Sequence, residues 1–201
     1  MRVGIFGGTF DPVHYGHLLL AESCREQRGL DEVWFLPTAV PPHKQSPDLT
    51  PAAERIEMLE LAVAGHDVFS VVRYEADRGG INYTADTLAH LRQRHADCEL
   101  FFLVGADMLH DLPRWHQPER ICELAAVVAV RRPGTGEIDF DCLRAVAPAQ
   151  RIDEIRHNQV EMPEIGISST EIRRRVAAGL SIRYMTPRAV EKYVEAHGLY
   201  V

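Results

Sequence analysis

The chain has 201 residues, 46% of them hydrophobic and 25% charged, which predicts a soluble globular protein with room for one substantial core. Its net charge of −7 and isoelectric point near 5.8 argue against a surface that coats nucleic acid, although not against a local pocket for one small anion. No apolar run approaches the roughly 20 residues that span a bilayer, and the first apolar run stops at two glycines, too early for a signal peptide.

Apolar runs separated by glycine, proline and polar stretches divide the chain into strands and helices. In the second helix, the spacing of Ile56, Leu59 and Val63 marks the buried side. In chain order we predict a strand over 2–6, a helix over 18–28, a strand over 32–37, a helix from 51, a strand over 68–73, a helix over 83–95, strands over 99–104 and 125–130, and helices over 138–147, 169–178 and 187–196.

Capping signals support several of these boundaries. Gly29 is predicted to end the first helix, and glycines likewise follow the last two helices. Thr50 and Thr186 are each followed by proline, so we expect both to cap helices. Residues 147–163 give the weakest pattern, and there we expect a loop and a short strand that ends at Met162.

The predicted strands are continuous apolar runs, and they alternate with helices along the chain. This pattern predicts a single domain over residues 1–201 with a Rossmann-like α/β fold: a doubly wound parallel sheet, helices on both faces and a helical C-terminal end. Ligands of such sheets bind beyond the carboxyl ends of the strands, where the strand order reverses. The loops to inspect are therefore GGTFDPVH, PTAVPPHK, GADMLHDLPRW and RRPG, which follow the first, second, fourth and fifth strands.

The stretch GGTFDPVHYGH, residues 7–17, joins the first strand to the first helix and carries His14 and His17. It lacks the lysine of the GxxxxGK[ST] phosphate loop and the spacing of the GxGxxG dinucleotide fingerprint. A zinc site would need a third ligand, and simple packing or capping is the plain alternative for both histidines. However, the N–H groups of a helix start favour an anion, and imidazoles donate to phosphate oxygens. We therefore expect the two histidines to bind a polyphosphate.

A second anion site is indicated by IGISSTEIRRR near the other end of the chain. The hydroxyls of Ser168, Ser169 and Thr170 precede a predicted helix that carries Arg173 in its first turn. Hydroxyls, unpaired N–H groups and an arginine together make a cradle for phosphate. An ordinary helix cap is the alternative when these residues are taken alone.

Together, GGTFDPVHYGH and ISSTEIR resemble the paired signatures of the HxGH nucleotidylyltransferase superfamily. Within it, the chain is similar to the bacterial nicotinate-nucleotide adenylyltransferases. The similarity spans nearly the whole chain, although residues 134–163 match poorly. Further matching stretches, in order, are PPHK (41–44), RIEML (55–59), YTADTL (83–88), FFLVGADML (101–109), LPRW (112–115) and TPRAVEKYVEAHGLY (186–200).

The resemblance implies attack by the 5′-phosphate of nicotinate mononucleotide on the α-phosphorus of ATP, with release of pyrophosphate. The nucleophile is already an anion, so no strong general base is required, and catalysis can come from alignment and charge neutralisation. The resemblance implies catalytic roles for His14, His17 and Arg173, and Mg²⁺ carried by the triphosphate. The ATP-binding residues that it implies are Gly8, Thr9, Phe10, His14, His17, Gly105, Asp107, Ser169, Thr170 and Arg173.

For the mononucleotide, Lys44 in its proline-rich loop is placed to reach the phosphate, and Trp115 offers a flat face to the pyridine. Helix-start N–H groups near Thr84 can hold the pyridine carboxylate. A solvated lysine, a core tryptophan and, for Asp107, a helix cap are the structural alternatives. The mononucleotide-binding residues that the resemblance implies are Lys44, Tyr83, Thr84, Trp115 and Arg132.

Other functions remain open on the sequence alone. A member of the same superfamily could use nicotinamide mononucleotide or phosphopantetheine as acceptor, or could be a cytidylyltransferase. A nucleotide sensor without turnover and a zinc hydrolase built on His14 and His17 belong to other classes. Four cysteines without a CxxC pair argue against a zinc knuckle or disulfide framework and predict reduced thiols in a cytoplasmic protein: Cys24, Cys98, Cys122 and Cys142.

Overall fold

The computed structural model describes residues 1–39, 49–131 and 136–201. The strands are β1 (Arg2–Gly8), β2 (Glu32–Pro37), β3 (Phe69–Val71), β4 (Glu99–Gly105), β5 (Ala126–Arg131) and β6 (Val160–Glu161). The helices are α1 (Tyr15–Arg28), α2 (Ala52–Val63), α3 (Tyr74–Arg78), α4 (Thr84–Arg94), α5 (Ala106–Asp111), α6 (Pro118–Leu124), α7 (Ala149–His157), α8 (Ser169–Ala177) and α9 (Arg188–His197), with 3₁₀ turns η1 (Leu112–Arg114) and η2 (Phe140–Ala145).

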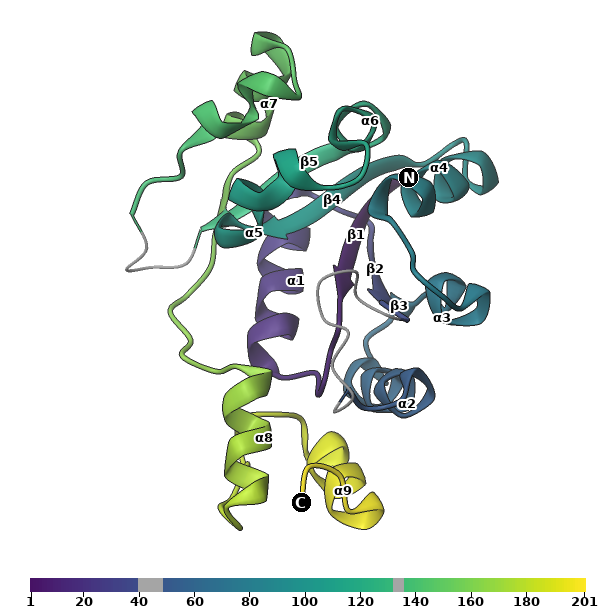
Figure 1. The fold of residues 1–201 in the computed structure, drawn as a ribbon, viewed down its shortest axis with the longest axis vertical. Coiled ribbons are helices and arrows are strands. Elements are labelled where there is room, and N and C mark those ends of the chain that lie inside the picture. The colour runs from purple at the N-terminus through teal and green to yellow at the C-terminus, as the bar shows by residue number, and fades with distance from the viewer. Residues whose placement is uncertain (40–48, 132–135) are drawn as a thin grey trace.

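The strands form one parallel sheet in the order β3-β2-β1-β4-β5-β6 (Figure 1). This confirms the predicted fold class. From β1 the sheet extends through β2 to β3 on one side, whereas β4, β5 and β6 follow one another on the other side of β1. The strand order therefore reverses between β1 and β4, and the crevice beyond their carboxyl ends is the expected ligand site.

Side chains of β1, β2, β4 and β5 alternate between two apolar clusters, one on each face of the sheet, whereas β3 and β6 contribute to the second cluster. In β4, for example, Phe102 belongs to the first cluster and Phe101 to the second. Residues of α4, α6 and α7 complete the first cluster, whereas α1, α2, α8 and α9 complete the second. Because α1 and the C-terminal helices share one face, the end of the chain lies beside the loop that leads into α1.

Several helix ends differ from the predicted ones. The first helix begins at Tyr15, three residues earlier than predicted, because the chain turns helical directly after an extended His14; a left-handed Gly29 ends it as predicted. Thr50 and Thr186 do not cap helices, because the N-cap positions of α2 and α9 are the prolines that follow them. The Thr186 hydroxyl instead donates to the carbonyl of Val13 at 2.7 Å.

The segment of weakest pattern also holds corrections. A helix, α7, occupies most of the stretch expected to be a loop, and the helix predicted over 138–147 is the shorter 3₁₀ turn η2. Only Ile152 and Ile155 of α7 are buried, so its apolar stripe is too narrow to stand out in the sequence. The predicted short strand is β6, which stops one residue before Met162.

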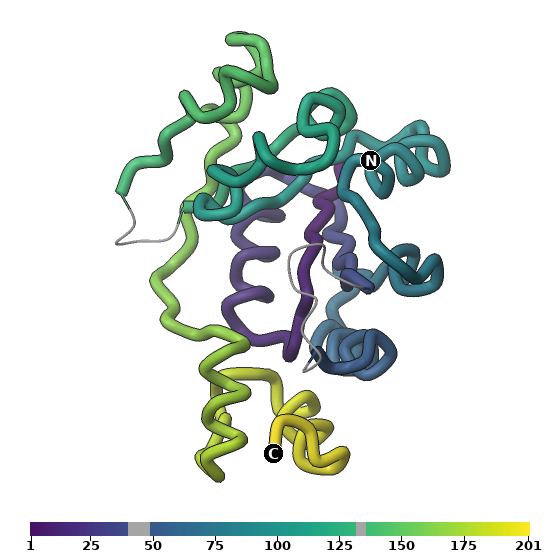
Figure 2. The backbone as a smooth tube through the Cα atoms, in the orientation of Figure 1, coloured from purple at the N-terminus to yellow at the C-terminus, as the bar shows by residue number. Residues whose placement is uncertain are grey.

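In Figure 1, α8 and α9 lie together at one end of the molecule and α7 lies at the opposite end. The chain between them runs along the edge of the sheet, as the tube in Figure 2 shows. Among the described residues, no helix combines the length and apolar character needed to cross a membrane.

Candidate functional site

The loop between β1 and α1 is built around Phe10. Its backbone has a φ of +49°, which is uncommon for a bulky residue, and its side chain is only 1% exposed. The ring packs against Phe6 and Phe35, with centroid separations of 5.5 and 5.8 Å. A Cβ atom at Gly8 would lie 2.8 Å from this ring. Glycine at position 8 therefore gives the loop the space to fold over a buried aromatic side chain.

The two histidines of the motif contact each other at the start of α1. His14 is the N-cap residue and is 6% exposed, and its backbone N–H donates to Nδ1 of His17 at 3.3 Å. Their rings stack with a centroid separation of 3.7 Å. Because Nδ1 of His17 accepts, we assign the proton of the neutral ring to Nε2. A Cβ atom at Gly16 would come within 3.0 Å of the His14 ring, so the glycine between the histidines also provides space.

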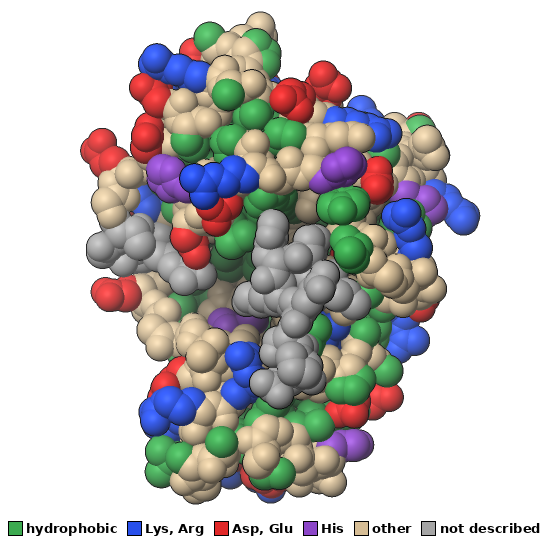
Figure 3. Space-filling view, in the orientation of Figure 1, with side chains coloured by type: hydrophobic (Ala, Val, Ile, Leu, Met, Phe, Trp, Pro, Cys, Tyr) green, Lys and Arg blue, Asp and Glu red, His purple; other side chains and the backbone are tan. Residues whose placement is uncertain are grey.

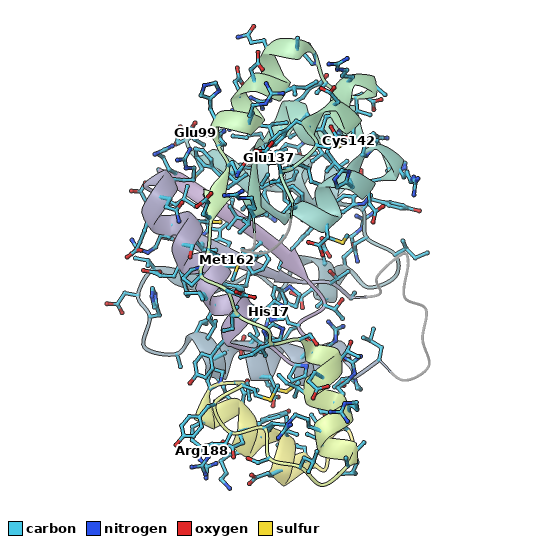
Figure 4. All side chains as sticks on the ribbon, turned by 90° about the vertical axis from the view of Figure 1, so that its left-hand side faces the viewer. His17, Glu99, Glu137, Cys142, Met162 and Arg188 are labelled. Carbon is cyan, nitrogen blue, oxygen red and sulfur yellow. The ribbon has the colours of Figure 1, made fainter. Side chains whose placement is uncertain are left out.

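A first cavity, of about 190 Å³, opens beside these histidines at the carboxyl ends of β1 and β4. In the space-filling view of Figure 3, a hollow lies in the middle of the face turned to the viewer, and a histidine side chain is visible inside it. In Figure 4, His17 and Met162 lie in the middle of the molecule, away from Arg188 at one end and Cys142 at the other. Six predicted ATP-binding residues line this cavity: Gly8, Phe10, His14, His17, Gly105 and Asp107.

A second and larger cavity, of about 770 Å³, lies next to the first. It brings together the predicted mononucleotide residues Tyr83, Thr84 and Trp115, and it also includes Thr9. The two cavities share part of their lining, so they lie next to each other against a common wall. The shared residues are Gly7, Gly8, Phe102, Met108 and Trp115.

The start of α4 faces the second cavity. Tyr83 is the N-cap residue, and its side chain makes no capping hydrogen bond, so it leaves the first N–H groups of the helix for another acceptor. Its ring instead lies against that of His116, with centroids 4.3 Å apart. The preceding turn is held by Asn82, whose side-chain amide donates to the carbonyl of Glu75 at 3.1 Å and also contacts the carbonyls of Gly79 and Gly80.

Glu75 is a buried carboxyl group in the wall of the second cavity. It is 8% exposed, and its Oε1 accepts a hydrogen bond from the Thr87 hydroxyl at 2.8 Å. Burial raises the pKa of Glu75, an effect that the Thr87 hydrogen bond and the charge of Arg78 only partly oppose.

The second predicted anion site docks on the β1–α1 loop. Ser168 is the N-cap of α8 and accepts from the Glu171 N–H, so the ordinary capping alternative holds for this residue. The Ser169 hydroxyl donates to the Pro12 carbonyl at 2.9 Å, and Nη1 of Arg173 donates to the Asp11 carbonyl at 2.7 Å. Ser169, Thr170 and Arg173 thus lie beside the first cavity rather than among the residues that line it.

The other predicted site residues are Asp107, Lys44 and Arg132. Asp107 lies in the first turn of α5, but the N-cap residue there is Gly105, so the helix-cap alternative for Asp107 is wrong. Asp107 lines the first cavity, where its carboxylate is available to a ligand. Lys44 and Arg132 lie outside the described residues.

Sequence reasoning missed Arg55, whose side chain on α2 is fully buried. Its guanidinium donates to the carbonyls of Thr9 at 2.7 Å, Thr50 at 2.8 Å and Ala39 at 3.0 Å. It therefore ties the β1–α1 loop to the chain at Ala39 and at Thr50. The only signal in the sequence is an arginine directly before Ile56, on the apolar side of a helix.

Comparisons with known proteins show which family the chain belongs to. The sequence pattern of the cytidylyltransferase-like family matches residues 5–175. A Thermomicrobium roseum protein named probable nicotinate-nucleotide adenylyltransferase is 48% identical over 199 residues, which cover 99% of this chain and 91% of that protein. The nicotinate-nucleotide adenylyltransferase of Bacillus subtilis is 42% identical over 200 residues, which cover 99% of this chain and 98% of that protein.

One solved structure with a similar fold is Plasmodium falciparum nicotinic acid mononucleotide adenylyltransferase complexed with NaAD. The TM-score is 0.78, and the match covers 99% of this chain and 97% of that chain. With 19% sequence identity, this likeness establishes the fold alone.

Proposed function

The chain belongs to the cytidylyltransferase-like family and, within it, to the nicotinate-nucleotide adenylyltransferases, and on this premise we propose that it transfers the adenylyl group of ATP to nicotinate mononucleotide. A phosphate oxygen of the mononucleotide forms a bond to the α-phosphorus of ATP, and the bond from that phosphorus to the bridging oxygen of pyrophosphate breaks. The products are nicotinate adenine dinucleotide and pyrophosphate, and the reaction belongs to NAD biosynthesis.

The observation that carries the proposal is the common wall of the two cavities at Gly7 and Gly8, next to His17. ATP in the first cavity and the mononucleotide in the second would meet at this wall. Both reactants are anionic, so the work of the site is to align them and to neutralise charge. The Nε2–H of His17 and the N-terminal end of α1 supply positive potential at this point.

The position of each group supports the remaining roles that we propose. Asp107 accepts hydrogen bonds from the adenosine ribose, and Trp115 stacks on the pyridine ring. The first N–H groups of α4, around Tyr83 and Thr84, hold the pyridine carboxylate. Arg173 and Ser169 lie where α8 meets the loop, on the side of the β- and γ-phosphates.

A divalent cation, which we propose to be Mg²⁺, would accompany ATP. Among the described residues, no group of three or more histidine, cysteine or carboxylate side chains is arranged to hold a metal ion. The cation would therefore be held by the triphosphate oxygens, where it neutralises charge. We further propose that residues 1–201 act as one catalytic domain in the cytoplasm, where the four free cysteines stay reduced.

Pyrophosphate release from ATP and Mg²⁺ against a panel of acceptors tests the function. Nicotinate mononucleotide should give the highest kcat/KM, above nicotinamide mononucleotide and phosphopantetheine. Preference for either of these two would move the chain to another acceptor within the superfamily. ATP binding without pyrophosphate release for any acceptor would point to a nucleotide sensor and overturn the proposal.

A further inference from the structure

We propose that Tyr200 is a positioning residue of the active site, which acts through Asp11 on the loop that presents His14 and His17. The Tyr200 hydroxyl donates to Oδ1 of Asp11 at 2.7 Å, across 189 residues of sequence. The inference rests on the proposed function, because it assigns the C-terminal segment a part in holding the ATP-binding loop. It concerns the shape of the loop before any substrate binds.

The β1–α1 loop needs external support because of Phe10. A left-handed backbone at a bulky residue is unfavourable and persists only when its surroundings hold it in place. Support is found on both sides of this residue. On one side Arg55 binds the Thr9 carbonyl, and on the other Arg173 and Tyr200 bind the carbonyl and the carboxylate of Asp11.

The contact at Asp11 is well shielded from water. Asp11 is 4% exposed, and its second oxygen, Oδ2, lies 3.5 Å from the Thr50 N–H. Burial raises the pKa of Tyr200, and the neighbouring Asp11 carboxylate adds to this shift, so the phenol remains a donor across the physiological pH range. A hydrogen bond to a carboxylate in such a low-dielectric site is stronger than one at the surface.

The geometry separates the role of the hydroxyl from that of the ring. The Tyr200 ring packs, half-buried, against the apolar cluster that includes α1, α2, α8 and α9, so it fastens the C-terminal segment regardless of its hydroxyl. The hydroxyl reaches a residue that lies two peptide units before Val13 and three before His14. Tyr200→Phe therefore removes the hold on Asp11 while the packing of the ring is kept.

The chain supplies a matched control in Tyr193. Its hydroxyl donates to a carboxylate oxygen of Glu57 at the same distance, 2.7 Å, but this contact joins α9 to α2 at the surface. Tyr193→Phe thus removes the same type of hydrogen bond from the same C-terminal region without touching the loop. Any effect of general loosening of the C-terminal helices should appear in both variants.

We expect Tyr200→Phe to lower kcat by about tenfold, since a shift of the phosphates by a fraction of an ångström is costly, and to raise the KM for ATP. The KM for nicotinate mononucleotide should change less than twofold, and Tyr193→Phe should match the wild type. Combining Tyr200→Phe with Asp11→Ala should give less than the product of the separate effects, because each variant alone already removes the same hydrogen bond. Unchanged kinetic constants in Tyr200→Phe, or effects equal to those of Tyr193→Phe, would overturn the proposal.

A second measurement separates this proposal from the proposed function. The ring ¹H–¹⁵N signals of His14 and His17 can be recorded in the folded, substrate-free protein, so they need no activity. They should shift in Tyr200→Phe and stay in place in Tyr193→Phe. Unshifted histidine signals would refute the positioning role even in an active enzyme. A wild type that is inactive with nicotinate mononucleotide, but in which Tyr200→Phe shifts these signals, would refute only the function.

Discussion

A single buried guanidinium, that of Arg55, binds carbonyl groups from three separate segments of the chain. Burial lowers the pKa of Arg55, while the nearby Asp11 carboxylate opposes that shift. Buried carbonyls that lose their donor are costly, because water cannot reach them. At the scale of one residue, the β1–α1 loop at Thr9 and the described chain at Ala39 and Thr50 therefore depend on the same side chain.

Arg55→Lys should destabilise the fold by about 1–3 kcal/mol, because an ammonium group cannot reach all three carbonyls in the planar geometry of guanidinium. Chemical denaturation measures this, and the KM for ATP should rise in the same variant. Arg151→Lys is the control, since Arg151 also binds two carbonyls, those of Cys122 and Ala125, but its side chain is 27% exposed. An equal loss of stability in both variants would contradict the special role of Arg55.

His17→Asn should lower kcat by roughly 10²- to 10⁴-fold with a much smaller rise in the KM for ATP, as expected when one preorganised donor is removed. Asparagine can still accept from the His14 N–H through Oδ1, so the start of α1 should persist. Steady-state kinetics and thermal unfolding together test this. His66→Asn, which alters another stacked but exposed histidine, should leave kcat unchanged. Near-normal turnover in His17→Asn would remove His17 from the mechanism.

At the scale of elements, the sequence was most informative where apolar runs are continuous. The first, second, fourth and fifth strands were predicted within two residues, because each is a run of buried side chains bounded by glycine, proline or charge. Helices α3, α5 and α6 were missed because they have five to seven residues, too few to show a period. Thr50 and Thr186 were misassigned because a hydroxyl's partner in the fold, such as the Val13 carbonyl, cannot be read from neighbouring residues.

The start of α4 should distinguish nicotinate from nicotinamide mononucleotide. Converging N–H donors pair with a carboxylate, whereas they leave the NH₂ group of the amide without an acceptor. An unpaired buried polar group costs about 1–3 kcal/mol, so kcat/KM should favour the acid by roughly tenfold to a few hundredfold.

Trp115→Ala tests where that preference arises. In the proposed function the tryptophan stacks on the ring common to both substrates, so its removal should lower kcat/KM for both by a similar factor and preserve their ratio. Equal use of acid and amide by the wild type would contradict a pocket of donors at α4. A ratio that collapses only in Trp115→Ala would move the discrimination to the tryptophan.

The buried Glu75 of α3, which accepts a hydrogen bond from Thr87 of α4, should make stability depend on pH. Its pKa is raised in the folded protein above the ordinary value of 4.5, so the fold is favoured by the protonated form. Stability should fall as the pH rises from about 4.5 through the raised pKa, and then level off. Glu75→Gln should abolish this loss, because the amide stays neutral and its oxygen can still accept from Thr87.

Unfolding temperatures of the wild type and Glu75→Gln between pH 4 and pH 8 provide the measurement. The variant should be the more stable protein at pH 8, and the difference should shrink toward pH 4. Glu171→Gln is a control for which the change in stability should have the opposite sign. Arg174 holds the pKa of the Glu171 carboxyl below its ordinary value, so Glu171→Gln should be less stable than the wild type at neutral pH. A parallel pH profile for wild type and Glu75→Gln would contradict the burial effect.

At the scale of the whole molecule, the doubly wound sheet and the position of the site beyond β1 and β4 were both predictable, because they follow from the alternation of strands and helices. The supports of the site were not. Arg55 and Tyr200 bind Thr9 and Asp11, which lie 46 and 189 residues away in the sequence, and no local pattern predicts contacts over such separations. The roles of the residues that line the two cavities stay predictions.

The binding of the two substrates should respond separately to substitution. Arg173→Ala should weaken ATP and Lys44→Ala should weaken the mononucleotide, each by roughly 1.5–3 kcal/mol, as for charge-assisted hydrogen bonds. Because Arg173 also binds the Asp11 carbonyl, its removal should lower kcat as well. Both KM values measured in both variants test the assignment. A Lys44→Ala variant that is impaired only toward ATP would show that the two ends are wrongly assigned.

The wall shared by the two cavities has a consequence for how the product leaves. In the proposed function, nicotinate adenine dinucleotide would span both cavities as a ligand with two tethered arms. Its dissociation constant would then approach the product of the dissociation constants of the two arms divided by the effective concentration. With a Kd of roughly 100 µM for each arm and an effective concentration of about 10 mM, the product would bind with a Kd of about 1 µM. Tightening each arm tenfold would lower this to about 10 nM, and release would then limit turnover. A site of this shape therefore favours weakly bound substrates, because tighter binding of either substrate also tightens the binding of the product and slows its release.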